Sequence, residues 1–145
     1  VRRKLMVGHP HLYAAESYIA QQGEPASLAD LDGHALIVYG HENAPPAPSL
    51  NWLVHVGQDE QEPLRQAKLT VNNVIAMLRA AESGLGIATL PDYLARNRRL
   101  VRVLPQIEGP SFTAYFVYPE ELRNSKRVAV FRDFLLEKVG GEDSW

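Results

Sequence analysis

The chain has 145 residues, of which 46% are hydrophobic and 22% are charged, and its formal net charge is −2. These values are typical of a globular domain, so they exclude a disordered chain and do not favour nucleic acid as a direct partner. The absence of cysteine excludes a disulfide framework and thiolate chemistry. No apolar run approaches the ~20 residues of a membrane span, and we expect a soluble, cytoplasmic domain.

The first half of the chain alternates short strands with short helical segments. β-Branched and aromatic runs predict the strands, and Gly23 ends the first helix. In chain order we expect a strand at 12–14, a helix at 16–22, a helical turn at 27–31, and strands at 35–39 and 52–56. The proline-rich segment His41–Ser49 predicts a stiff surface loop between the last two strands.

The second half continues the alternation. We expect strands at 68–71, 87–90, 100–104 and 113–117, a helix from Val74 that ends at a left-handed Gly84, a short helix at Pro91, and a last helix after Ser125. In the last helix an apolar stripe is expected to face inward, formed by Val128, Val130, Phe131, Phe134 and Leu135. Strands that alternate with helices indicate an α/β domain with much parallel pairing.

Two adjacent amides, Asn72 and Asn73, stand between a predicted strand and a predicted helix. One asparagine suffices to cap the helix start, where backbone N–H groups lack internal partners. A second adds polar groups beside the positive end of the helix, which suits a carboxylate, a phosphate or a sugar hydroxyl. In open α/β sheets ligands bind beyond the carboxyl ends of strands, and the pair is expected at such an end. The alternative is one cap and one solvated turn residue.

The stretch "TVNNVIAMLRAAESGLGIATLPDYLA" closely resembles the effector-domain signature of LysR-type transcriptional regulators. The resemblance extends to "HLYAAESYIAQQGEPASLADLDGHALIVYG" before it and to "NRRLVRVLPQIEGPSFTAYFVYPEELRNSKRVAVFRDFLLEKV" after it. It therefore covers the chain from about Val1 to Val139. Each motif is moderately specific, and four of them in the family's order and spacing make the resemblance strong.

The resemblance implies a periplasmic-binding-protein-like, two-lobed fold of type II with one lobe incomplete at its N-terminal side. Residues 1–20 would end the first lobe and residues 21–111 would form most of the second. A crossing strand and the C-terminal helix, residues 112–139, would return to the first lobe, and residues 140–145 would form a tail. The family's helix-turn-helix has no counterpart here, so DNA would be bound only through a domain absent from this chain.

By the same resemblance, Asn72 and Asn73 match effector-contacting positions of the second lobe. Ala15 stands where the family often has Ser or Thr, and Glu16 where it often has Pro, so a hydroxyl is lost and a negative charge is gained. The neighbouring Ser17 is a candidate to replace that hydroxyl. Because half of the cleft is expected to be missing, we predict weak or absent effector binding by this chain alone.

The remaining polar residues do not predict catalysis or a metal site. His9 and His11 share one face of a strand, a spacing that can bind metal, but no third ligand is evident and solvated or edge-strand histidines are favoured. No nucleophile elbow, Walker loop or dinucleotide-binding loop occurs. No cofactor and no enzymatic activity are therefore expected.

We thus expect an effector-sensing and oligomerisation domain of a LysR-type regulator. It would bind a small polar or anionic molecule between the lobes, modulate DNA binding and transcription by the full-length protein, and form a homodimer or homotetramer. The alternative is the solute-binding module of a transporter, which shares the two-lobed fold.

Overall fold

The structure, a computed structural model, describes residues 1–40 and 48–140. Most of the predicted loop His41–Ser49, and the predicted tail beyond residue 140, lie outside the described residues. The chain divides into two compact units, which are described separately: unit 1 comprises Val1–His9 and Ser111–Trp145, and unit 2 comprises Pro10–Pro110. The lobe boundaries predicted at residues 20 and 111 stay a prediction.

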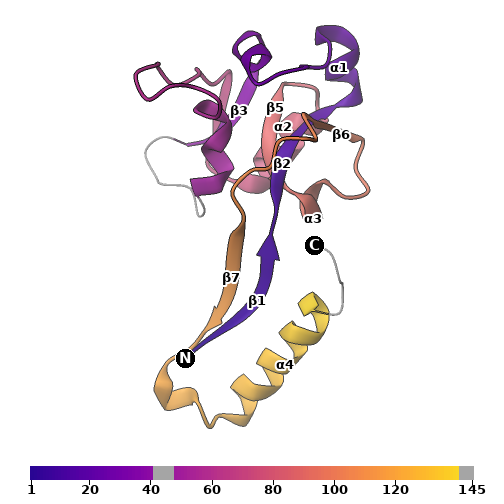
Figure 1. The fold of residues 1–145 in the computed structure, drawn as a ribbon. Helices are drawn as coiled ribbons and strands as arrows, with labels where there is room; N and C mark the ends of the chain where they lie inside the picture. The colour runs from indigo at the N-terminus through magenta and orange to yellow at the C-terminus, as the bar shows by residue number, and fades with distance from the viewer. Residues whose placement is uncertain (41–47, 141–145) are drawn as a thin grey trace. The chain divides into compact units, whose positions relative to one another are not determined.

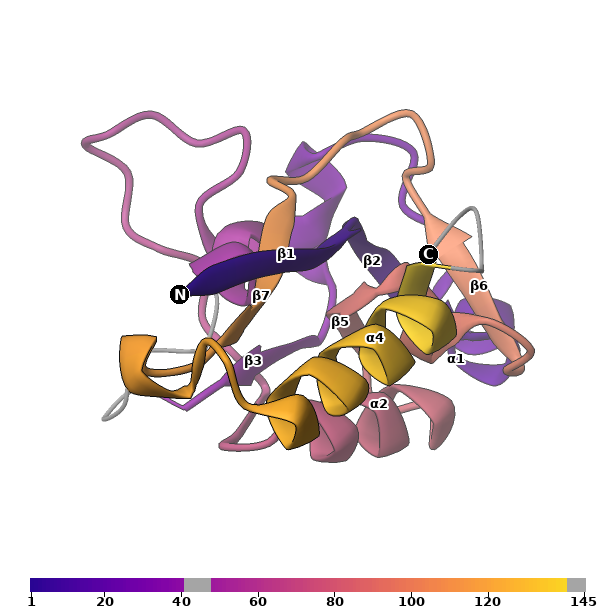
Figure 2. The ribbon, with the colours of Figure 1, turned by 90° about the horizontal axis from the view of Figure 1, so that it is seen from below.

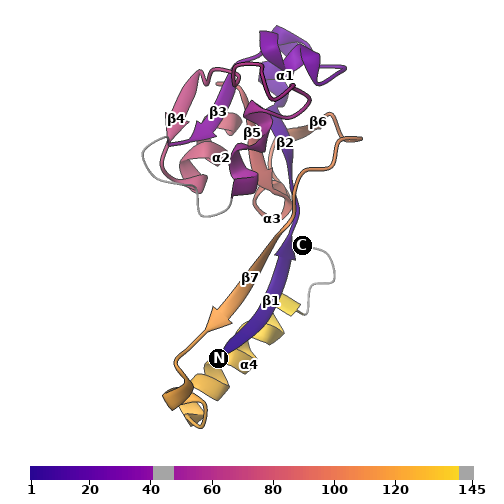
Figure 3. The ribbon, with the colours of Figure 1, turned by 60° about the vertical axis from the view of Figure 1, so that its left-hand side comes forward.

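Unit 2 is built on a five-stranded mixed sheet with strand order β4-β3-β5-β2-β6 (Figure 3). The strands are β2 (Pro10–Ala15), β3 (Leu36–Tyr39), β4 (Leu69–Val71), β5 (Ile87–Pro91) and β6 (Leu100–Val103). β3 pairs in parallel with both β4 and β5, whereas β2 runs antiparallel to β5 and β6. All five strands overlap predicted ones, because each is a short apolar run bounded by turn residues.

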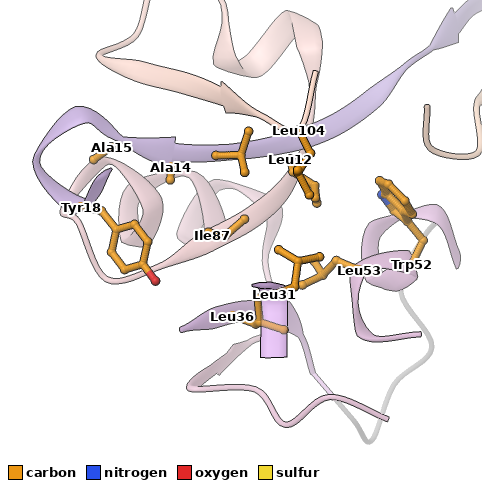
Figure 4. Close-up of a cluster of buried hydrophobic side chains, with 11 residues drawn as sticks. Leu12, Ala14, Ala15, Tyr18, Leu31, Leu36, Trp52, Leu53, Ile87 and Leu104 are labelled. Carbon is orange, nitrogen blue, oxygen red and sulfur yellow. The ribbon is translucent and has the colours of Figure 1, made fainter. Parts of the chain in front are cut away.

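Helices cover both faces of this sheet. Helix α2 (Val74–Glu82) packs on one face, where its Met77, Leu78 and Ala81 are fully buried. The strand residues in their cluster alternate along each strand with residues that face the other side of the sheet. The other face carries the second cluster, in which the 3-10 helices η1 (Ala29–Gly33) and η2 (Pro48–Val54) supply Leu31 and Leu53 (Figure 4). The period of two along each strand therefore divides the apolar side chains between two cores.

The helix ends follow the predicted signals. Helix α1 (Glu16–Gln22) ends at Gly23, whose φ is 81°, and α3 (Asp92–Ala95) begins directly after Pro91. After α2, Gly84 adopts a φ of 76°, and its N–H donates to the carbonyl of Ala81 at 3.0 Å. That left-handed residue, the first of Gly84-Leu85-Gly86, turns the chain from α2 into β5, and the helix end predicted at Gly84 is confirmed.

The strand predicted at 52–56 is wrong, because the segment forms η2 and the turn after it. Trp52 and Leu53 are adjacent and both are buried in the same cluster. Neighbouring residues of a strand point to opposite faces, whereas a helical turn places both side chains on the same core. His55, within the same segment, is exposed.

Unit 1 consists of a two-stranded antiparallel ribbon and one long helix (Figures 1 and 2). Strand β1 (Arg2–Gly8) pairs with β7 (Phe112–Val117), the short 3-10 helix η3 (Glu120–Leu122) follows, and α4 (Lys126–Gly140) contacts β1. The Phe116 ring packs edge-on against Phe131, with 5.8 Å between ring centroids.

The apolar stripe predicted for the last helix exists, but most of it is not covered. Val130, Phe131 and Phe134 expose 70%, 52% and 50% of their surface. Of the buried hydrophobic side chains in the described residues, only Tyr118 belongs to unit 1. The prediction that the whole stripe faces inward is therefore wrong in this chain, because a ribbon of two strands is too narrow to cover it.

Candidate functional site

The start of α2 lies directly after β4 and is capped by Asn73. Asn73 has an extended backbone, and its Oδ1 accepts hydrogen bonds from the N–H groups of Ile75 at 2.8 Å and Ala76 at 3.3 Å. Two of the backbone donors that a helix start leaves unpaired are thereby satisfied. Since the oxygen is used by the helix, the side-chain NH₂ group remains as a donor, and it has no partner among the described residues.

Asn72 is exposed, and its side chain forms no hydrogen bond with any described residue. It lies beside Gly40, which follows β3: a Cβ added at Gly40 would stand 3.8 Å from the Cβ of Asn72. The N–H of Gly40 donates to the carbonyl of Val71 at 2.7 Å, so the pairing of β3 with β4 continues to this point. The first asparagine thus serves no capping role, and its amide is available to a ligand.

Replacing Asn73 with alanine is expected to destabilise the chain by roughly 0.5–2 kcal/mol, because Ile75 and Ala76 lose their capping acceptor. The matched change Asn72→Ala removes no cap and is expected to leave stability nearly unchanged. Urea unfolding followed by circular dichroism measures both. Equal losses of stability in the two variants would show that the capping assignment is wrong.

The carboxyl ends of the parallel strands β4, β3 and β5 lie at one edge of the sheet, here called the carboxyl edge. Asn72, Gly40 and Asp92 are the residues that follow these three strands. Neighbouring strands lie about 4.8 Å apart, so the strand ends before Asn72 and Asp92 are separated by roughly 10 Å. Gly40 stands between them without a side chain, at the edge where open α/β sheets bind ligands.

Asp92 holds two side chains of β2 at this edge. Its Oδ1 lies 2.6 Å from Nδ1 of His11 and accepts a 2.7 Å hydrogen bond from the hydroxyl of Tyr13. Burial, reinforced by the hydrogen bond to Asp92, raises the pKa of Tyr13 well above its ordinary value, so this hydroxyl stays protonated and donates.

His11 is not the solvated or edge-strand residue that the sequence favoured. It is 8% exposed and lies in β2, which pairs on both sides, with β5 and β6. Asp92 is 81 residues away along the chain, so the sequence showed no partner for it. The one available signal was the spacing of His11 and Tyr13, which places both on one face of a strand.

Ala15, Glu16 and Ser17 lie at the opposite edge of the sheet. β2 is antiparallel to β5, so β2 starts at the carboxyl edge and its last residue, Ala15, lies at the other edge. There Ala15 pairs with Leu100, the first residue of β6. A Cβ at Gly84 would stand 3.0 Å from the Ser17 Oγ, so Ser17 lies beside the last turn of α2.

These three residues line a pocket of about 190 Å³ together with Glu82 and Arg99. Ala15 is buried, and Arg99 lies 3.7 Å from Glu16 in an exposed ion pair. Helix α2 has nine residues and is therefore roughly 13 Å long, and it separates this pocket from the asparagines at its start. The structure does not bring the two groups of predicted site residues together.

Within residues 1–40 and 48–140, no three His, Asp or Glu side chains are grouped so that they could hold a metal ion. His9 is exposed, while the Nδ1 of His11 is occupied by Asp92. Over the same residues, no helix is long and apolar enough to cross a membrane.

Comparison with curated proteins finds transcription regulators. An HTH-type transcriptional regulator of Haemophilus influenzae is 29% identical over 123 residues, which are 82% of this chain and 41% of that protein. The HTH-type transcriptional regulator YhjC of Escherichia coli is 32% identical over 127 residues, which are 84% of this chain and 42% of that protein. The chain thus spans less than half the length of these relatives.

Solved structures of similar fold are regulatory domains. The regulatory domain of CrgA, a LysR-type regulator from Neisseria meningitidis, matches with a TM-score of 0.72 and 26% identity over 97% of this chain and 69% of that one. Full-length AphB of Vibrio cholerae matches with a TM-score of 0.72 and 20% identity over 96% of this chain and 48% of that one. These neighbours confirm the predicted α/β fold of the type II periplasmic-binding-protein class.

The family model for the LysR substrate binding domain matches residues 1–140, nearly the whole chain. The match includes the strand, the asparagine pair, the capped helix and the Gly-Leu-Gly turn described above. The chain belongs to the LysR substrate-binding domain family.

Proposed function

We propose that this chain senses a small polar or anionic effector at the carboxyl edge of unit 2, with Asn72 and Asn73 as contacts, and thereby modulates DNA binding and transcription by a LysR-type regulator. The exposed Asn72 amide at the start of α2, within a chain matched by the LysR substrate binding domain over residues 1–140, carries this proposal. The relatives are named HTH-type regulators, which favours this function over a transporter module.

The proposed activity is binding, without a catalytic step or a cofactor. DNA contact is assigned to a helix-turn-helix domain outside this chain, as the names of the relatives and the share of their length that it spans suggest. Location in the cytoplasm, where DNA is found in bacteria, stays a prediction. The pocket at Ala15, Glu16 and Ser17 is a second candidate site for the effector. Its Glu16 is already paired with Arg99, and the pocket lies at the other end of α2 from Asn72, so we favour the carboxyl edge.

A thermal-shift screen of small carboxylates, sugars and amino acids tests the proposal. A compound that binds only the folded chain raises its melting temperature according to its concentration and its Kd, so a weak ligand is detected at high concentration. We expect at least one compound to raise the melting temperature of the wild type and to have little effect on Asn72→Leu. Equal shifts in both proteins would contradict a site at Asn72.

We further propose that the chain self-associates through unit 1. The large exposed hydrophobic side chains lie mostly in that unit, on β7 and α4, among them Val117, Val130 and Phe134. Val130, Phe131 and Phe134 also line an open hollow of about 520 Å³ on α4. An uncovered apolar surface of this kind is typical of an interface.

Val130→Asp is expected to shift the chain from a dimer or larger assembly to the monomer, because a carboxylate in the middle of an apolar interface loses its hydration. Leu64→Asp changes a side chain of similar exposure in unit 2 and serves as the matched control, with assembly expected to persist. Sedimentation velocity measures both. A wild-type chain that sediments as a well-folded monomer would contradict self-association.

A further inference from the structure

His11 is a buried residue with one ring nitrogen in use. The residue is 8% exposed, and its Nδ1 is bound to Asp92 at 2.6 Å. No described residue is bound to the other ring nitrogen, Nε2. A buried imidazole usually uses both nitrogens or places the second where solvent or a ligand reaches it. Nε2 of His11 is not among the buried polar atoms of the described residues that lack a partner, so it lies where solvent or a ligand can reach it.

The ring of His11 is held in a defined orientation. An ionised carboxylate only accepts hydrogen bonds, so Nδ1 of His11 and the hydroxyl of Tyr13 are both donors to Oδ1 of Asp92. The raised pKa of Tyr13, caused first by burial and then by this bond, keeps the hydroxyl in its donating form. With Nδ1 donating to a carboxylate, the orientation of the imidazole is fixed. Nε2 then accepts a hydrogen bond when the ring is neutral and donates one when the ring is an imidazolium.

His11 shares both an edge and a face of the sheet with the start of α2. His11 pairs with Leu90 near the end of β5, so it lies at the carboxyl edge. Tyr13, two residues further along the same face of β2, packs in the cluster that contains Met77 and Leu78 of α2. Helix α2 starts at the same edge and covers the same face. It follows β4, however, which lies three strand spacings, roughly 14 Å, from β2.

Several groups at this place can donate hydrogen bonds to a ligand. The Oδ1 of Asn73 is used as a helix cap, so its amide offers only donors, and the helix start adds a positive partial charge. The Oδ1 of Asp92 is engaged by His11 and Tyr13. A carboxylate carries the strong, directional acceptors that such donors bind best.

We propose that His11, in its imidazolium form, donates to the effector through Nε2–H, that Asp92 and Tyr13 are positioning residues for its ring, and that the group it reads is a carboxylate. The inference rests on the proposed effector site at Asn72 and Asn73, and it adds a third contact from a different strand. An effector with its carboxylate at His11 and another polar group at the start of α2 would link β2 to β4 across the carboxyl edge.

Nuclear magnetic resonance with sodium acetate as the probe tests this proposal on the 145-residue chain. The titration follows the imidazole signals of His11 and the side-chain amide signals of Asn72 and Asn73 at constant pH and ionic strength. Methylammonium chloride is the control for a small cation, and the exposed His55 of the same sample is the control imidazole. We expect acetate to shift the signals of His11, Asn72 and Asn73 saturably, and to leave His55 unchanged.

Two variants test whether Asp92 and Tyr13 position the ring of His11 for the ligand. Asp92→Ala is expected to abolish the acetate response of His11 while the response of Asn72 persists. Tyr13→Phe keeps the ring in the core and removes only the hydroxyl, and it is expected to weaken the same response in a folded protein even if Asp92→Ala does not fold. A response of His11 that neither variant changes would overturn the positioning roles.

The outcomes also distinguish this inference from the function on which it rests. A saturable response of Asn72 and Asn73 without one at His11 would overturn the role of His11 and leave the effector site standing. No response at any of the three residues would overturn both. Equal responses to acetate at His11 and His55 would show unspecific binding and would likewise overturn the proposal.

Discussion

Arg65→Met is expected to destabilise unit 2 by about 3 kcal/mol, because the buried carbonyl of Leu53 and the partly buried carbonyls of Val56 and Leu28 lose a charged donor. A bond to a charged group contributes roughly 1.5–3 kcal/mol, and less where water can replace the donor. The Arg65 side chain is only 4% exposed. Its Nη1 donates to the carbonyls of Val56 at 2.7 Å and Leu53 at 3.1 Å, and its Nε donates to Asp32 Oδ1 at 2.6 Å. Methionine fills a similar volume but offers no donor.

Arg79→Met is the matched control for this prediction. The Arg79 side chain is 65% exposed and forms an ion pair with Glu82 on the surface of α2, a contact that contributes little in water. Urea unfolding of the wild type and both variants gives the three free energies of unfolding. If Arg65→Met and Arg79→Met were equally stable, the hydrogen bonds of the Arg65 guanidinium to η1 and η2 would not contribute to the stability of unit 2.

Gly86→Ala is expected to be the second strongly destabilising change, at the upper end of the ~1–3 kcal/mol typical of overpacking. A Cβ at this buried position would stand 2.4 Å from the carbonyl oxygen of Ala35 and 2.9 Å from its carbonyl carbon. That oxygen also accepts the N–H of Ile87 at 2.8 Å, so the start of β5 is held in place and cannot move away without losing a bond.

Gly33→Ala is the control for Gly86→Ala, because nothing lies within 4 Å of a Cβ added at Gly33. Differential scanning fluorimetry ranks the two variants against the wild type. The expected order is wild type and Gly33→Ala close together, with Gly86→Ala clearly lower. A Gly86→Ala chain as stable as Gly33→Ala would mean that β3 and β5 approach less closely than described.

Local patterns predicted most of the elements. The helix at 16–22 and its stop at Gly23 are confirmed, as are the strand before Asn72 and the left-handed Gly84. Each of these depends on residues close in the chain, where propensity and capping decide. The strand predicted at 52–56 failed because burial of two adjacent side chains in one core required a helical turn.

The candidate site was predictable only in part. Asn73 as a helix cap follows from its neighbours in sequence, and the structure confirms it. The separation of Ala15 from Asn72 depends on β2 running antiparallel to β5, and the direction of a strand within a sheet is not encoded in its own residues. For the same reason the pairing of His11 with Asp92 could not be predicted, since it needs the register of β2 on β5.

Chemical-shift mapping of the most active compound from the thermal-shift screen locates the effector directly. We predict that the largest changes in backbone amide shifts occur at Gly40, Asn72, Asn73 and Asp92, the residues around the carboxyl edge. Changes confined to the pocket of Ala15, Glu16 and Ser17 would instead place the ligand at the other end of α2, and would contradict effector sensing by the asparagine pair.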